Sequence, residues 1–340
     1  MTDSKGAKRR LLFLLALVAL LAIACDTSGP QDFLQQQDGP RAKQADNLWD
    51  ITFGIAVVVF FLVEGVLVFT ILKFRRKPGR EAAQFHGNTK LEVILTVIPS
   101  LILAGLAVPT VRTIFDAAAE PTGALNVTVD AKQFWWEYSY PDLDLVTANE
   151  LHIPVDQPIY ISVESTDVIH SFWIPRLGGT QDAIPGRSNK MVIQADEPGE
   201  YWGQCKEFCG LSHANMRLRV VAHEQSDFEN WVAEQREDAA EPGGSLARQG
   251  QELFMSNACA GCHTIGGTVA AGRAGPDLTH FASRHTFAGA IFDIEEGRLR
   301  EWVADAPSMK PGVLMPSGTK ELGLSQNEVD AIVAYLLSLE

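Results

Sequence analysis

Two long apolar segments near the N-terminus limit what this chain can fold into. Residues 51–72 and 91–111 are predominantly apolar, and each is long enough to cross the ~30 Å hydrocarbon core of a bilayer as a helix. The segment between them, KFRRKPGREAAQFHGNTK, is rich in Lys and Arg, which favours the cytoplasmic side. We therefore expect a multi-pass protein with a transmembrane hairpin over residues 49–112 and everything after residue 112 on the outer face.

The start of the chain resembles an export signal. Residues 1–24 combine a basic beginning with a short apolar core, as in a secretory signal peptide. The sequence LAIAC resembles a bacterial lipobox, which predicts a lipid on Cys25 and an exported segment over 25–48 in a bacterial cell membrane. An ordinary anchor, or a plain signal with an incidental cysteine, is the alternative. The net charge of -14 argues against a nucleic-acid partner.

The exported part changes character twice. Residues 120–224 contain short runs rich in Val, Ile and aromatic residues, separated by Pro and Gly, which predicts a small β-sandwich or barrel. Residues 225–245 read as a short helix followed by a flexible acidic linker, EDAAEPGGS. Residues 246–340 have helical periodicity, and Ser325 with Glu328 has the spacing of a capping box. We expect a separate all-α domain there.

The first cluster of sulfur and imidazole lies in QCKEFCGLSHANM. It holds Cys205, Cys209, His213 and Met216, and the stretch DVIHSFWIP supplies His170. Thiolate and thioether favour copper, and imidazole tolerates both of its oxidation states. Because strand residues alternate, the methionine at the start of MRLRVV points inward. Two cysteines could bridge two copper ions. A structural disulfide is the alternative, but it gives the histidine and the methionine no role.

The second cluster is CAGCH. Its spacing is that of a c-type haem attachment site, with thioether bonds to Cys259 and Cys262 and with His263 as an axial ligand of the iron. A zinc site needs a second pair of ligands at suitable spacing, which the sequence lacks. A redox C-x-x-C pair needs neither the histidine nor a helical domain.

A methionine is expected as the sixth iron ligand of an electron-transfer cytochrome. Met309 and Met315 both lie a suitable distance downstream. KPGVLMP resembles the ligand loop of small cytochromes c, which favours Met315 and leaves the other methionine to core packing. AGPDL resembles the segment whose proline carbonyl orients the haem histidine, here Pro276.

The stretch IHSFWIPRLGGTQDAIPGR followed by GQCKEFCGLSHANM resembles subunit II of haem–copper cytochrome c oxidases. With the two spans and KQFWWEYSYP, the resemblance covers about residues 45–224. It implies a cupredoxin-like fold with a binuclear copper centre, CuA, and magnesium at the contact with subunit I, held partly by the Glu207 side chain. The implied copper ligands are two bridging cysteines, one histidine on each copper, a weak methionine and a backbone carbonyl: Cys205, Cys209, His170, His213, Met216 and Glu207.

A CuA domain followed by a c-type cytochrome resembles subunit II of caa3-type oxidases. The resemblance implies electron transfer from haem c to CuA and on to subunit I, which reduces O₂ to water with proton translocation. The expected partners are subunits I and III, membrane lipid, and either cytochrome c or a quinol–cytochrome reductase complex as donor. The alternatives are the equivalent subunit of a CuA-containing nitric oxide reductase and a copper-delivery protein. A quinol oxidase subunit would lack the copper ligands.

The resemblance also singles out residues that bind no metal. The family typically has tryptophan as the first aromatic after the Gln of QFWWEY, where it receives the electron. Here that residue is Phe134, with Trp135 and Trp136 behind it, and simple aromatic packing is the alternative. Glu92 matches the family's glutamate at the cytoplasmic mouth of the K proton pathway, and a solvated membrane-edge residue is the alternative. Glu64 lies deeper, and we expect only a hydrogen bond to a neighbouring helix.

Overall fold

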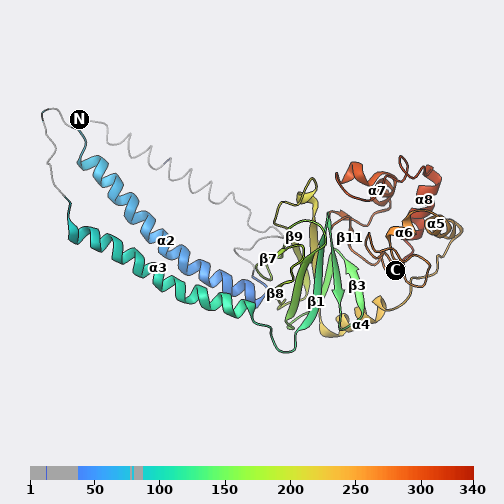
Figure 1. Cartoon of the computed structure of the whole chain (residues 1–340), viewed down its shortest axis with the longest axis horizontal. Coiled ribbons are helices and arrows are strands. Elements are labelled where there is room, and N and C mark those ends of the chain that lie inside the picture. The colour runs from blue at the N-terminus through green and yellow to red at the C-terminus, as the bar shows by residue number, and fades with distance from the viewer. Residues whose placement is uncertain (1–12, 14–36, 77–78, 80–86) are drawn as a thin grey trace.

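The computed structural model describes Phe13, residues 37–76, Gly79 and residues 87–340. Along the chain these residues form a helical hairpin, a β-sandwich and a mainly helical C-terminal domain (Figure 1). This order confirms the predicted fold class. The expected signal peptide over 1–24 and the expected lipid site at Cys25 lie outside the described residues.

The hairpin consists of α2 (Pro40–Lys73) and α3 (Thr89–Ala118), both long and apolar enough to span a membrane. The helices are longer than the predicted spans, mainly at the ends nearer the sandwich. Proline occupies the first turn of α2, and the Asn88 side chain caps α3 by accepting from Leu91 N. Ala42 is the one buried residue in these two helices. Such an apolar surface needs lipid or a partner to cover it.

The outer end of the hairpin is fixed to the sandwich. Asp38 forms an ion pair with Arg176, and the Asp38 carbonyl accepts from Asp196 N at 2.8 Å. Lys43, in the first turn of α2, pairs with the Asp196 carboxylate at 2.6 Å. A Cβ on Gly39 would collide with neighbouring backbone carbonyls. The C-terminal end of α2 and the N-terminal end of α3 lie far from the sandwich (Figure 1).

The sandwich is built from two five-stranded sheets. One has the order β3-β2-β1-β5-β8 and the other β4-β10-β9-β6-β7. Buried and half-exposed residues alternate along β1, β2 and β5, so their inner faces form the core. The strands are β1 (Leu125–Lys132), β2 (Trp135–Tyr140), β3 (Leu145–Ala148), β4 (Glu150–Pro154), β5 (Ile159–Ser165), β6 (His170–Trp173), β7 (Thr180–Ala183), β8 (Asn189–Ile193), β9 (Gly199–Cys205) and β10 (Arg217–His223).

The C-terminal domain packs α5 against α8. A Cβ on Gly250 would collide with the Ala331 carbonyl, so glycine permits this close helix crossing. The capping box of Ser325 and Glu328 starts α8, as the sequence predicts. The elements are α5 (Ser245–Ser256), α6 (Cys259–Cys262), β11 (Thr286–Phe287), β12 (Phe292–Asp293), α7 (Glu296–Met309) and α8 (Gln326–Leu336).

The connection between the two soluble domains makes contacts with both. After α4 (Gln225–Gln235), the Arg236 guanidinium donates to Leu143 O of the sandwich. Ala239 N then donates to Gly266 O of the C-terminal domain at 3.2 Å. The segment predicted to be a flexible linker, residues 237–245, is thus hydrogen-bonded to the C-terminal domain at Ala239, and Arg236 directly before it is hydrogen-bonded to the sandwich.

Candidate metal and haem sites

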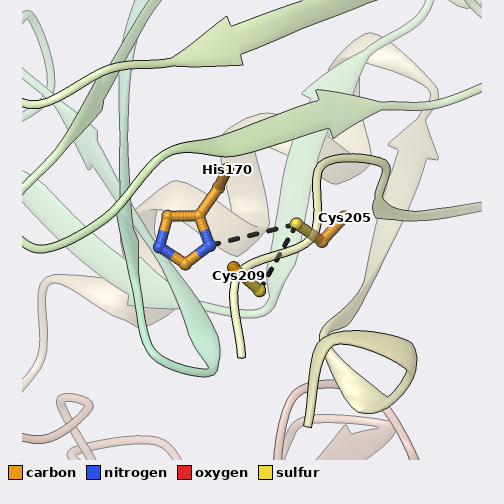
Figure 2. Close-up of side chains that lie close together, drawn as sticks. All are labelled: His170, Cys205 and Cys209. Carbon is orange, nitrogen blue, oxygen red and sulfur yellow. Dashed lines mark hydrogen bonds between the residues drawn. The ribbon is translucent and has the colours of Figure 1, made fainter. Parts of the chain in front are cut away.

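Three sulfur and imidazole groups meet at one end of the sandwich. His170 opens β6, Cys205 closes β9, and Cys209 follows in the loop before β10. Their ligand atoms all lie within 4.8 Å of one another, and all three residues are buried. Figure 2 shows the His170 ring and the two thiols converging. A soft, buried donor set of this kind suits copper.

The two thiols of this site are separate. Cys205 Sγ and Cys209 Sγ lie 3.8 Å apart, whereas a disulfide bond measures about 2.05 Å. The hydrogen bond between the thiols lowers the pKa of Cys205, which favours one thiolate in the pair. The thiolate is the form that binds metals. The structural disulfide considered as an alternative is therefore not formed in this structure.

The other expected copper donors lie around the two thiols. His213 Nδ1 is 3.7 Å and Met216 Sδ is 3.9 Å from Cys209 Sγ. The Glu207 carbonyl oxygen is 3.2 Å from Cys205 Sγ, and the Glu207 side chain is exposed. The structure thus brings all six expected donors together, and their chemistry fits a copper centre.

Sequence reasoning missed one residue at this site, Asp167. His170 Nε2 donates to its carboxylate at 2.7 Å, which leaves Nδ1 facing Cys205 Sγ at 3.9 Å. Partial burial alone would raise the pKa of Asp167, but hydrogen bonds, the strongest from His170, lower it overall. A carboxylate in this position fixes the tautomer and the orientation of a metal-binding imidazole. The D-x-x-H spacing was the available signal.

A cavity of about 590 Å³ lies between the C-terminal domain and the sandwich. Cys259, Cys262, His263 and Met315 all line it, as attachment of a haem requires. Met309 ends α7 and does not line the cavity. Met315, the methionine favoured by the sequence, therefore lies at the wall of the cavity that holds the C-x-x-C-H residues.

The His263 ring is held by a backbone carbonyl. His263 Nδ1 lies 2.7 Å from Pro276 O, so Nδ1 carries the proton and Nε2 is free to bind iron. Burial lowers the pKa of His263, which favours the neutral imidazole that binds metal. Sequence reasoning missed Arg273 and Arg284, which also line the cavity. Their charges suit the carboxylates of a haem.

The haem cavity borders the sandwich. Phe134 and Trp135 line it together with residues of the C-terminal domain. Trp136 points the other way and packs edge-on to the His170 ring, with ring centroids 6.1 Å apart. The loop before Phe134 also contacts the copper site, because Gln133 Nε2 donates to Cys209 O at 2.5 Å. The three aromatic residues proposed for electron entry thus divide between the two sites.

Comparison with known proteins agrees with this geometry. Family models match residues 28–113 (cytochrome c oxidase subunit II, transmembrane domain), 144–223 (the periplasmic domain of the same subunit) and 247–340 (cytochrome c). Cytochrome c oxidase subunit 2 of Alkalihalophilus pseudofirmus is 37% identical, over 88% of this chain and 90% of that protein. The chain belongs to the cytochrome c oxidase subunit II family.

Further relatives span the full chain or one domain. Cytochrome c oxidase subunit 2 of Bacillus subtilis is 35% identical, over 97% of this chain and 98% of its own length. The solved periplasmic domain of subunit II of cytochrome oxidase from Bradyrhizobium japonicum is 33% identical, with a TM-score of 0.33. It covers 34% of this chain and 96% of that chain.

Membership in the subunit II family implies the cofactors, a partner subunit and the location of the protein. The periplasmic domain implies copper, the cytochrome c domain implies haem c, and the family implies assembly with subunit I of a haem–copper oxidase. The apolar hairpin anchors the protein in a membrane, with the sandwich on its outer face. The names of the relatives favour neither a nitric oxide reductase nor a copper-delivery protein.

The two acidic residues expected in the membrane lie on the hairpin of this subunit. Glu92 is in the first turn of α3, at the end far from the sandwich. Glu64 lies within α2, and its side chain is exposed in the isolated chain. Among the described residues, α3 therefore does not cover the Glu64 side chain, and the expected hydrogen bond to a neighbouring helix stays a prediction.

Proposed function

We propose that this subunit II receives electrons at a covalently bound haem c and passes them to a binuclear CuA centre. Subunit I then takes them up and reduces O₂ to water with proton translocation. The haem ligands are His263 and Met315, with thioether bonds to Cys259 and Cys262. Two copper ions held by the Cys205 and Cys209 thiolates would share one electron, so that each bond would change little on reduction.

One observation carries this proposal. The copper donors and the haem cavity lie on the two sides of a single short segment, residues 133–136. The chain therefore brings an electron donor site and an electron acceptor site together without a diffusing carrier. Tethering a donor in this way raises its local concentration at the acceptor.

The surroundings support a place in a larger complex. The hairpin exposes apolar side chains along both helices, which fits a multi-pass subunit of a bacterial cell membrane packed against subunit I and lipid. The exposed Glu207 carboxylate, next to a copper-facing carbonyl, suits a magnesium site shared with subunit I. Subunit III and a cytochrome c or quinol–cytochrome reductase donor complete the proposed set of partners.

The test uses the purified full-length chain loaded with copper and haem. We expect two copper ions for each haem, with a purple, mixed-valence absorption and electron resonance signal. After flash reduction of the haem, the copper band should bleach at a rate independent of protein concentration. The variant Cys209→Ser should abolish the copper signal and leave the haem spectrum intact. Copper-replete protein with a Cys205–Cys209 disulfide would overturn the proposal.

A further inference from the structure

Two buried charged side chains at the boundary of the soluble domains have no role in the function proposed above. Glu150 lies at the start of β4, the edge strand of the second sheet, and is 0% exposed. Lys310 follows α7 in the C-terminal domain and is 1% exposed. Burial of a charged group is costly unless hydrogen bonds compensate for the lost water. The hydrogen-bond partners of Glu150 and Lys310 therefore show which parts of the structure the two buried groups connect.

Among the described residues, the three hydrogen-bond donors to the Glu150 carboxylate all come from the C-terminal domain. Its carboxylate accepts from His285 N at 3.1 Å, from Thr286 N at 2.7 Å and from Thr286 Oγ1 at 2.8 Å. The last two donors belong to β11, which lies at the boundary with the sandwich (Figure 1). One carboxylate of the sandwich thus satisfies two backbone N–H groups and a hydroxyl of the C-terminal domain.

Lys310 makes the reciprocal contact. Its ammonium donates to Phe134 O of the sandwich at 2.7 Å and to Ala288 O of its own domain at 2.6 Å. Beside it, Arg217 N of β10 donates to Gly289 O at 3.0 Å. Gly289 has φ +79, and a Cβ there would collide with Lys310 Nζ and Phe134 O. The backbones of the two domains are therefore in direct contact around the ammonium group.

These contacts differ from those of a transient redox encounter. Transient encounter interfaces are small, and exposed charge pairs at their rim contribute little energy. The pair between His285 and Glu200, 3.3 Å apart and about half exposed, is of that kind. Glu150 and Lys310 are instead buried, and each reaches from its own domain to hydrogen-bond the other. Truncation of a hydrogen-bonded, buried charge is expected to weaken such an interface strongly.

We propose that Glu150 and Lys310 are positioning residues that hold the C-terminal domain in one fixed pose on the sandwich, with segment 285–289 as the docked element. This pose keeps Phe134 between the haem cavity and the copper loop. The proposal rests on the proposed function for the purpose of the pose. According to this proposal, the C-terminal domain does not move on the 236–244 connection but stays docked on the sandwich.

The structural test measures hydrogen exchange of the backbone amides of the full-length, cofactor-loaded chain. Glu150→Gln and Lys310→Met, placed on opposite domains, should each raise exchange at Arg217, His285 and Thr286 by about tenfold or more, because each removes a charged hydrogen-bond partner. The matched controls are Glu234→Gln on α4 and Lys320→Met on the C-terminal domain, both exposed. They should leave these amides unchanged, and the haem and copper spectra of all four variants should stay normal.

The kinetic test measures haem-to-copper electron transfer after flash reduction at increasing solvent viscosity. A fixed pose predicts one exponential phase whose rate is independent of viscosity in the original protein. Glu150→Gln and Lys310→Met, here called the clasp variants, should each show a slower phase whose rate depends on viscosity. In these variants the C-terminal domain must first reach its docked position by diffusion. Loss of folding alone would not create such a dependence.

Two results would overturn the proposal: viscosity-dependent transfer in the original protein, or unchanged exchange at Arg217, His285 and Thr286 in both clasp variants. Absence of copper or of any haem-to-copper transfer would instead defeat the proposed function. The exchange measurement would still decide whether the clasp holds the domains together.

Discussion

The Ser212 hydroxyl donates a 2.6 Å hydrogen bond to Pro311 O. Ser212 is buried and directly precedes His213 of the copper site, and Pro311 begins the loop that leads to Met315 of the haem cavity. The two ligand loops, which belong to different domains, therefore touch. Any movement of one domain relative to the other would therefore displace the ligand loops of both sites.

The choice of the axial methionine can be tested by substitution. Met315→Ala should abolish the weak sulfur-to-iron absorption band at the red end of the visible spectrum, since Met315 lines the haem cavity. The haem itself should stay attached through Cys259 and Cys262. Met309→Ala is the matched control and should leave the band in place. The opposite pattern would assign the ligand role to Met309.

The aromatic segment should show two distinct phenotypes. Phe134→Leu changes the wall of the haem cavity and should slow haem-to-copper transfer while the copper spectrum stays normal. Trp136→Leu removes the ring that packs on His170 and Phe172, and should destabilise the sandwich by on the order of 2 kcal/mol and perturb the copper spectrum. Flash photolysis and thermal unfolding measure the two effects. Equal losses of transfer with unchanged copper spectra would argue against this division.

The carboxylate beside His170 should govern copper affinity. Asp167→Asn weakens the hydrogen bond that orients the imidazole, and loss of such a partner lowers metal affinity roughly 10- to 100-fold. Competition with a copper chelator measures the change. Asp182→Asn, an exposed residue on β7, is the control and should bind copper like the original protein. Equal affinity in both variants would leave Asp167 without this role.

The docked state should become more stable at alkaline pH. Burial lowers the pKa of Lys310 from 10.5 to about 7. Between these values the undocked state binds more protons than the docked state, so docking strengthens as the pH rises through this window. A neutral amine still has two N–H groups for Phe134 O and Ala288 O, so deprotonation keeps the contact.

Hydrogen exchange of segment 285–289, corrected for the intrinsic pH dependence of exchange, measures this effect. Protection should grow between about pH 7 and pH 9 in the original protein. It should be flat over the same range in Lys310→Met. Protection that falls with pH in the original protein would contradict the shift.

Glu92 can be tested as a proton entry point in the assembled complex. Its place in the first turn of α3 puts a carboxylate at the end of the hairpin that faces the cytoplasm in the expected topology. Glu92→Gln should slow steady-state O₂ reduction several-fold while haem-to-copper transfer stays normal. Glu64→Gln provides the comparison within α2. Unchanged turnover of Glu92→Gln across the pH range would favour a solvated residue at the membrane edge.

The sequence predicted the features that depend on local spacing. The hairpin follows from uninterrupted apolar runs, and the copper and haem residues lie in short motifs whose members are close in the chain. Asp167 was also within reach, three residues before His170. The start of α2 at Pro40 was not predicted, because residues 40–50 are mainly polar and the contacts of this end of the helix with the sandwich, through Asp38 and Lys43, are visible only in the structure.

The docking of the domains could not be predicted from the sequence. Glu150 and Thr286 are separated by 136 positions, and Lys310 and Phe134 by 176. Glu150 stands in no motif, and Lys310 opens KPGVLMP, where the resemblance concerns the methionine and not the lysine. Most glutamates and lysines lie on the surface. Only the tertiary structure shows that these two are buried and that each meets the backbone of the other domain.

Both soluble domains contribute to the wall of the haem cavity. The C-terminal domain therefore cannot be exchanged independently of the sandwich. A foreign cytochrome grafted after residue 245 would bring its own iron ligands, but it would meet a sandwich shaped for different neighbours. Residues 133–135 would then cover no cavity, and the Glu150 carboxylate would be left without donors. Successful exchange between relatives would require the sandwich edge to be transferred with the cytochrome. The two surfaces at the domain boundary therefore have to be exchanged together.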